Sequence, residues 1–137
     1  MIGGVFLLAR DPSALAAWYE RHLGWRLTRM DDGAWFTELR YRDADGRATA
    51  QRLVYAIMPG DPGPTGSGCI VNYRVDDLQA VLATLRDSGV ETEPVVIGDD
   101  GDGDGSFVRL LDPEGHRIEL WEHIGHRPAV VVKPPEA

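Results

Sequence analysis

The two halves of this sequence of 137 residues carry one pattern twice. Residues 5–25 read VFLLARDPSALAAWYERHLGW, and residues 71–91 read VNYRVDDLQAVLATLRDSGVE. Each begins with a short apolar run that leads to an aspartate, continues with apolar residues three or four positions apart, and reaches a glycine. The short run predicts a strand, and the three-and-four spacing predicts an amphipathic helix. Asp11 aligns with Asp77, so the repeat spans about half of the chain.

The two expected helices have matching signals at their ends. Asp11 and Asp77 are N-cap candidates, and Pro12 occupies a first-turn position at which proline is tolerated. Gly24 and Gly89 stand where a left-handed C-terminal cap belongs. Both helices carry one apolar stripe. It consists of Leu15, Trp18, Tyr19 and Leu23 in the first helix and of Leu78, Val81, Leu82 and Leu85 in the second.

Both halves continue as a meander of about three strands. The strand-like runs are 33–39 and 52–57 in the first half and 95–97, 105–111 and 117–121 in the second. Turns rich in Asp and Gly separate them, at 43–46 and at 112–115.

Each half therefore reads as a βαβββ module. We predict an α+β fold in which two tandem βαβββ modules form a curved mixed sheet around a cup, with the helices outside. The run GDPGPTGSG at 60–68 is rich in residues that break regular structure and marks the joint. We expect one domain, made of a module at 1–59, a linker at 60–67, a module at 68–124 and a tail at 125–137.

The run GDDGDGDGSF at 98–107 begins like the calcium-binding loop of an EF-hand. Asp100, Asp102 and Asp104 have the right spacing, but the position of the bidentate glutamate falls on Leu111. An EF-hand also needs flanking helices, whereas the neighbouring runs predict strands. We interpret this stretch as a connecting loop.

Charge and cysteine content exclude several classes of function. The formal net charge of −8 argues against nucleic acid and anionic membranes as partners, since both need clustered Lys and Arg. Cys69 is the only cysteine, so neither an intrachain disulfide nor a cysteine-cluster zinc site can form. No apolar run approaches the length of a membrane span, and we expect a cytoplasmic protein.

Three segments resemble the vicinal oxygen chelate superfamily, which includes glyoxalase I, extradiol dioxygenases, and bleomycin- and fosfomycin-resistance proteins. They are ARDP at 9–12 with AWY at 17–19 and HLG at 22–24, NYRVDDL at 72–78, and DPEGHRIELWE at 112–122. The likeness runs from about Val5 to Glu122, and the last segment is its most specific part. The resemblance implies paired βαβββ modules, a small-molecule cup and a homodimer.

Enzymes of that superfamily hold a divalent metal through a His on the first strand and a Glu on the last strand of each module. Carried over position by position, the two histidines fall on Gly4 and Ile70, and the first glutamate falls on Val54 or Tyr55. Only Glu119 matches a ligand of the family. Three or four protein ligands are usual for a catalytic ion, so we expect no cofactor, while a divalent metal at Glu119 stays possible.

The four histidines offer few substitutes for the missing ligands. His22 lies on the first predicted helix beside the apolar stripe, where a packing or surface role is expected. His116 belongs to the predicted turn. His123 and His126 have a spacing that can chelate a metal, but they follow the last predicted strand.

Strand alternation sorts the side chains that would line the cup. The expected lining residues are Phe6, Leu8, Trp35, Ile70, Asn72, Arg74 and Trp121, with Glu119 beside them and Phe36 as the alternative to Trp35. Aromatic walls with a few polar groups are typical of small-molecule pockets. Arg74 could close the site by an ion pair with Glu119 or donate to an anionic ligand.

These features leave three functions open. The first is a small-molecule-binding protein of the glyoxalase/bleomycin-resistance kind that lacks the full catalytic metal site. The second is a metal-dependent lyase or dioxygenase with a shifted ligand set. The third is a structural or regulatory dimer without a ligand. The resemblance itself names no substrate.

Overall fold

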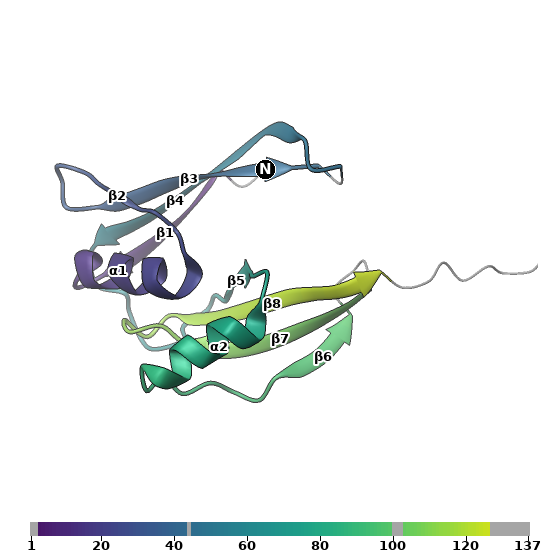
Figure 1. Cartoon of the computed structure of the whole chain (residues 1–137). Coiled ribbons are helices and arrows are strands. Elements are labelled where there is room, and N and C mark those ends of the chain that lie inside the picture. The colour runs from purple at the N-terminus through teal and green to yellow at the C-terminus, as the bar shows by residue number, and fades with distance from the viewer. Residues whose placement is uncertain (1–2, 44, 100–102, 127–137) are drawn as a thin grey trace, which may run out of the picture.

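The structure is a computed structural model that describes residues 3–43, 45–99 and 103–126. Its elements in chain order are β1 (Gly4–Ala9), α1 (Pro12–Leu23), β2 (Thr28–Arg29), β3 (Trp35–Arg42), β4 (Ala48–Pro59), β5 (Val71–Arg74), α2 (Leu78–Asp87), β6 (Val96–Asp99), β7 (Gly103–Leu111) and β8 (Arg117–His126). Figure 1 shows these elements along the chain.

Each half forms its own four-stranded mixed sheet. Sheet 1 has the strand order β1-β4-β3-β2, and sheet 2 has the order β5-β8-β7-β6. In both, the first strand pairs in parallel with the last, and the remaining pairs are antiparallel. The predicted tandem βαβββ fold is therefore confirmed. The two modules form two separate sheets, whereas we expected one continuous curved sheet.

The helix ends follow the sequence signals. The carboxylates of Asp11 and Asp77 accept hydrogen bonds from the backbone N–H groups of Ala14 and Ala80, both at 3.0 Å. Gly24 ends α1 with φ of 73°, in the left-handed region that glycine enters without a steric cost. Short polar side chains and one glycine thus fix where each helix begins and where α1 ends.

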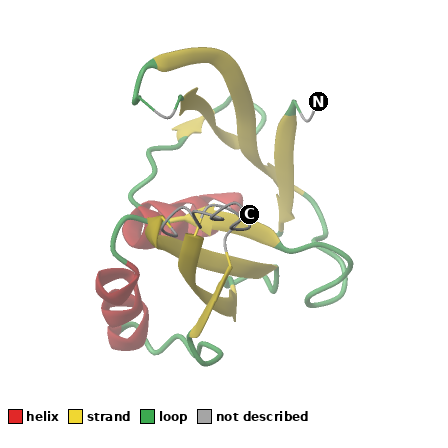
Figure 2. Cartoon of the chain, turned by 90° about the vertical axis from the view of Figure 1, so that its right-hand side faces the viewer, coloured by secondary structure: helices red, strands yellow, loops and turns green. Residues whose placement is uncertain are grey.

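The core lies where the two modules meet. Figures 1 and 2 place α1 between the two sheets and α2 at the side of sheet 2. Tyr19 of α1, Tyr55 of β4 and Tyr73 of β5 are buried together with Trp25 packed against them. The hydroxyls of Tyr55 and Tyr73 lie 2.7 Å apart, so the first module bonds directly to the second.

The turn between β7 and β8 also joins the modules. The buried carboxylate of Asp112 accepts a hydrogen bond from the Tyr19 hydroxyl at 2.8 Å and lies 2.6 Å from Nδ1 of His116. The other ring nitrogen of His116 lies 2.9 Å from the backbone oxygen of Leu8. Glu114 accepts a hydrogen bond from the backbone N–H of Asp11 at 2.7 Å. The DPEGH turn therefore contacts both β1 and α1 of the other module.

The run rich in Asp and Gly has a strand on each side, because β6 ends at Asp99 and β7 begins at Gly103. No helix flanks it, which removes the frame that an EF-hand needs. Asp100 and Asp102 lie outside the described residues, as does the tail beyond His126.

Between β4 and β5 the chain forms neither helix nor strand from Gly60 to Ile70. No helix among the described residues has the length and apolar character of a membrane span.

Candidate functional site

The face of sheet 2 that points away from the helices carries polar and aromatic side chains in two rows across the strands. One row pairs Arg74 with Trp121 and Trp121 with Phe107. The next pairs Asn72 with Glu119 and Glu119 with Arg109. The opposite face carries the buried residues Tyr73, Val108, Leu110, Ile118 and Leu120. The predicted alternation of β5 and β8 is observed in this register.

Both carboxylate oxygens of Glu119 are occupied by side chains of the chain itself. Oε1 accepts a hydrogen bond from the amide of Asn72 at 2.8 Å, and Oε2 accepts one from Nε of Arg109, also at 2.8 Å. The Glu119 side chain is only 17% exposed, so this ion pair is partly shielded from water. The hydrogen bond to Glu119 and its charge raise the pKa of Arg109, which keeps the guanidinium charged.

Arg74 does not pair with Glu119. Of the two roles that we considered for Arg74, the ion pair with Glu119 is therefore wrong, and the role of donor to an anionic ligand is left. Its guanidinium carbon lies 5.1 Å from the centre of the Trp121 ring, in a cation–π arrangement. Phe107 stacks on Trp121 with ring centres 6.2 Å apart and planes at 15°. Among the described residues, no carboxylate forms an ion pair with Arg74. Arg74 is thus a cation held on an aromatic ring with its N–H groups open.

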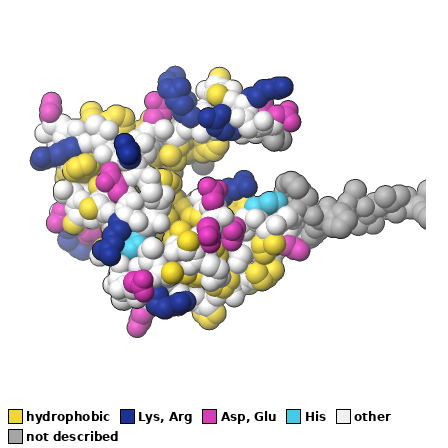
Figure 3. Space-filling view, viewed as in Figure 1, with side chains coloured by type: hydrophobic (Ala, Val, Ile, Leu, Met, Phe, Trp, Pro, Cys, Tyr) yellow, Lys and Arg dark blue, Asp and Glu magenta, His cyan; other side chains and the backbone are white. Residues whose placement is uncertain are grey.

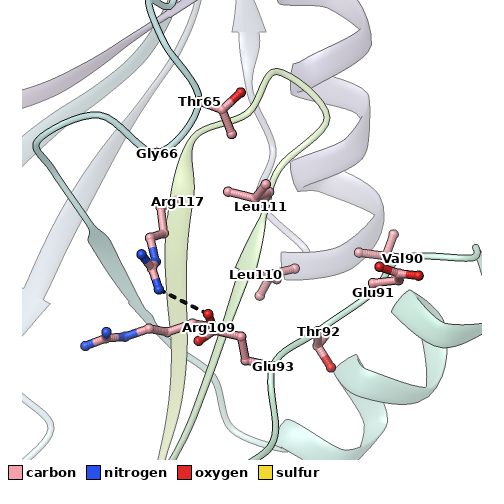
Figure 4. Close-up of a pocket in the computed structure, with 10 residues that line it drawn as sticks. All are labelled: Thr65, Gly66, Val90, Glu91, Thr92, Glu93, Arg109, Leu110, Leu111 and Arg117. Carbon is pink, nitrogen blue, oxygen red and sulfur yellow. Dashed lines mark hydrogen bonds and ion pairs between the residues drawn. The ribbon is translucent and has the colours of Figure 1, made fainter.

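Two cavities lie along β7 and meet at Arg109 and Glu93. The smaller, of about 360 Å³, is lined by Val96, Gly98, Phe107, Arg109 and Glu119 among others. The larger, of about 710 Å³, lies toward the β7–β8 turn (Figure 4). In it Arg117 pairs with Glu93 at 3.0 Å, and Thr65 and Gly66 of the linker form one wall. Sheet 2 and its edge therefore supply hollows with charged and apolar walls.

Sheet 1 carries the apolar residues Phe6 and Leu8 that we expected in the cup, apart from the two rows of side chains on sheet 2. Phe6 and Leu8 of β1 lie on the face away from α1 and are 60% and 43% exposed. Trp35, expected on the same face, instead packs against the core, because it pairs with the buried Ile57. Its neighbour Phe36 pairs with Ala56, as Phe6 does, and so occupies the face of Phe6.

Ile70 precedes β5 and is 41% exposed. No hydrogen bond, ion pair or ring contact among the described residues joins Phe6, Leu8 or Ile70 to the polar rows of sheet 2. Within one chain, the structure thus links Asn72 to Glu119 and Arg74 to Trp121, whereas Phe6 and Leu8 lie in the other sheet. Ile70 lies two residues before Asn72, immediately before β5.

The residues at the family's metal positions do not fit a divalent ion. Gly4, Ile70 and Val54 offer no ligand atom in their side chains, and Tyr55 is buried on the helix side with its hydroxyl on Tyr73. Glu119, the remaining position, is committed to Asn72 and Arg109. No group of three or more His, Cys, Asp or Glu side chains in the described part of the chain has a metal-binding arrangement.

The histidines do not complete such a site either. His22 is buried in the helix layer, with Nδ1 at 3.1 Å from the Thr84 hydroxyl, and its burial lowers its pKa. His116 serves the turn. His123 lies on β8, two positions beyond Trp121 on the same face, and the side chain of His126 lies outside the described residues.

Two residues of this face, Phe107 and Arg109, were absent from the sequence-based set. A signal for them exists, because a β-hairpin fixes its own register. The β7–β8 turn is centred near Glu114, and Arg109 and Glu119 lie at equal distances along the chain on either side of it. Counting outward from the turn pairs Arg109 with Glu119 and Phe107 with Trp121.

Two βαβββ modules with a mixed polar and aromatic sheet face define a protein of the vicinal oxygen chelate type. The chain belongs to the Glyoxalase/Bleomycin resistance protein/Dioxygenase superfamily, whose family model matches residues 2–120. A comparison with curated proteins found no match.

Solved structures share the fold at low sequence identity. A protein from the mobile metagenome of V. Pseudocholerae has a TM-score of 0.64 at 18% identity, with 91% of this chain and 95% of that chain covered. The fosfomycin resistance protein FosX from Listeria monocytogenes has a TM-score of 0.64 at 14% identity, covering 90% and 93%. A glyoxalase family protein from Bacillus anthracis has a TM-score of 0.60 at 17% identity, covering 90% and 94%. At such identities the likeness shows the fold alone.

Proposed function

We propose that this chain is a small-molecule-binding protein of the superfamily that works without the catalytic metal. One observation carries the proposal: Arg109 and Asn72 occupy both oxygens of Glu119, the only carboxylate at a family ligand position. A metal bound there would have to displace an ion pair that is partly shielded from water, and it would find no second ligand at Gly4, Ile70 or Val54.

The binding face itself supports the proposal. Small-molecule pockets combine apolar and aromatic walls with a few polar groups that fix orientation. Trp121 and Phe107 supply the aromatic wall, and Arg74 supplies a donor beside it, while the amide of Asn72 holds Glu119 in the next row. Phe6, Leu8 and Ile70 are further lining residues in this proposal, and Phe36 takes the place that we expected for Trp35.

Elemental analysis tests the metal part of the proposal. Protein purified without chelator and then incubated with Ni²⁺, Zn²⁺, Mn²⁺ or Fe²⁺ should keep far less than one ion per chain after desalting. Glu119→Gln should leave that value unchanged, as should Glu114→Gln, a control on the turn. Tight binding of one ion per chain that is lost only in Glu119→Gln would favour the metal-dependent lyase or dioxygenase instead.

Thermal shift measurements test the binding part. We expect some members of a library of aromatic and anionic metabolites to raise the melting temperature, because a ligand that binds only the folded state stabilises it by mass action. Trp121→Leu should reduce the shift. If no compound shifts the melting temperature at millimolar concentration, the binding function is wrong and a dimer without a ligand becomes the better description.

We further propose that the chain forms a homodimer. The support is the exposed apolar face of sheet 1, to which Phe6, Leu8 and Val54 contribute. In the space-filling view, apolar side chains also show in the recess between the parts of the molecule formed by the two sheets (Figure 3). The cytoplasmic location stays a prediction from the sequence.

A further inference from the structure

We infer that the ligand of the sheet 2 face is a small monocarboxylate with a flat apolar body. In this arrangement Arg74 binds the carboxylate, while Trp121 and Phe107 contact the body. The inference rests on the proposed binding function and adds the chemical class of the ligand.

The charges on this face select an anion. Arg109 is neutralised by Glu119 at 2.8 Å, and Arg117 is neutralised by Glu93 at 3.0 Å. Arg74 has no such partner among the described residues. One positive charge therefore remains uncompensated on this face, in a chain whose formal net charge is −8. A cationic ligand would meet Arg74 unfavourably, and a neutral ligand would leave its charge without a partner.

The same balance favours one negative charge over two. The second charge of a dianion such as a phosphate ester would find no partner, because Arg109 and Arg117, the other arginines of this face in the described part of the chain, are already paired with Glu119 and Glu93. A carboxylate matches the single free guanidinium in both charge and shape, since a guanidinium can donate two parallel N–H bonds to its two oxygens.

The position of Arg74 prepares it for this contact. A guanidinium that lies over an aromatic ring keeps its N–H donors at its edges, pointing away from the ring. The Trp121 ring thus restrains Arg74 before a ligand arrives, which reduces the entropy lost on binding. Asn72, one row away, keeps its amide on Glu119 and leaves Arg74 as the open donor.

The aromatic side chains beside Arg74 select the body of the ligand. Phe107, Trp121 and Arg74 form a continuous row, so a ligand held by Arg74 lies against aromatic side chains. Phe107 also lines the cavity of about 360 Å³. Arg74 and Trp121 do not line that cavity, so the flat apolar body of the ligand is inferred from the row of aromatic side chains and not from the cavity.

Calorimetric titration with matched pairs of compounds tests the inference. The probes are benzoate, 2-naphthoate and indole-3-acetate, each compared with its neutral amide of nearly the same shape. We expect at least one acid to bind about tenfold or more tightly than its amide, as for a charge-assisted hydrogen bond in place of a neutral one. Arg74→Gln should remove this preference. Arg86→Gln, which changes an exposed arginine on α2, should keep it. Trp121→Leu should weaken both compounds, and the acid more than the amide, because Arg74 also loses the ring that restrains it.

Three outcomes would overturn the inference: equal affinity for acid and amide in the unmodified protein, the same preference in Arg74→Gln, or no binding of any acid. Circular dichroism of each variant shows that the fold is intact. The proposed function fails on separate grounds. It is wrong if no compound of the wider library shifts the melting temperature or if one metal ion per chain binds through Glu119.

Discussion

Tyr19, Tyr55 and Tyr73 combine large apolar rings with hydroxyls that need partners in the core. Burial, followed by the neighbouring tyrosines, raises the pKa of Tyr19 and of Tyr55 well above the usual value. Burial also raises the pKa of Tyr73, to about 12. All three phenols therefore stay neutral at physiological pH and act as hydrogen-bonding groups within an apolar cluster.

The hydroxyl pair of Tyr55 and Tyr73 should show strong coupling. Tyr55→Phe or Tyr73→Phe alone should each destabilise the protein by about 1–3 kcal/mol, because the remaining buried hydroxyl loses its partner. The double variant should cost less than the sum of the two. Urea unfolding of the four proteins in the cycle measures this, and simple additivity would contradict it.

His22 should make stability depend on pH. Its burial, and to a smaller extent Arg21, lowers its pKa in the folded state, while the unfolded chain keeps a value of about 6.5. Below that pH the unfolded state binds a proton that the folded state resists, so stability falls as the pH decreases. The free energy of unfolding should therefore drop relative to that of His22→Gln between pH 7.5 and about 5.5. A constant difference between the two proteins would count against this cause.

At the scale of the element, the β7–β8 hairpin has two roles. Its strands place Phe107, Arg109, Glu119 and Trp121 on one face, and its turn bonds the second module to the first. The carboxylate of Asp112 is fully buried and has four partners: the Tyr19 hydroxyl, the His116 ring, and the backbone N–H groups of Glu114 and His116. The turn therefore shapes the hairpin and fixes its position against α1.

Replacing Asp112 with alanine should be among the most damaging single changes. The variant leaves the His116 ring and the Tyr19 hydroxyl without their shared acceptor, and each buried polar group left without a partner costs about 1–3 kcal/mol. Glu114→Gln, which keeps an acceptor for the N–H of Asp11 on an exposed part of the turn, should cost under about 1 kcal/mol. Equal losses measured by urea unfolding would show that the carboxylate does not organise the turn.

At the scale of the whole molecule, the two modules share one core but leave apolar surface open. The faces that meet contain the three tyrosines and the stripes of both helices. The face of β1 away from α1 exposes Phe6 and Leu8, and the edge of sheet 2 exposes Val96 and Ile97. Exposed apolar side chains that share one face, as Phe6 and Leu8 do on β1, are a common basis for association.

The dimer should depend on the face of β1. We expect the unmodified protein to elute as a dimer in size-exclusion chromatography with light scattering, and Phe6→Glu to shift it toward the monomer. Ile97→Glu is the matched control. Ile97 is as exposed as Phe6 but lies on β6, in the other sheet, where it pairs with Ser106. A monomer at all concentrations, or the same loss with Ile97→Glu, would exclude this interface.

The sequence was most informative where a rule is local. Asp11, Asp77 and Gly24 predicted the helix ends, because a cap depends only on a few neighbouring residues. Alternation along β5 and β8 predicted the shared face of Arg74 and Trp121. It did not decide which of Trp35 and Phe36 faces the core. That depends on how β3 pairs with β4, and this pairing shifts at a bulge between Arg40 and Arg42.

By itself the sequence determined the two-module architecture. The repeated pattern, the helix caps and the alternation of apolar and polar residues along the strands all depend on residues close together in the chain. The sequence also showed that most family metal positions carry no ligand. Only the tertiary structure decided the partners of Glu119, the ring on which Arg74 lies, and the division into two sheets. Those depend on which strands lie next to one another, a choice made by the packing of residues far apart in the chain.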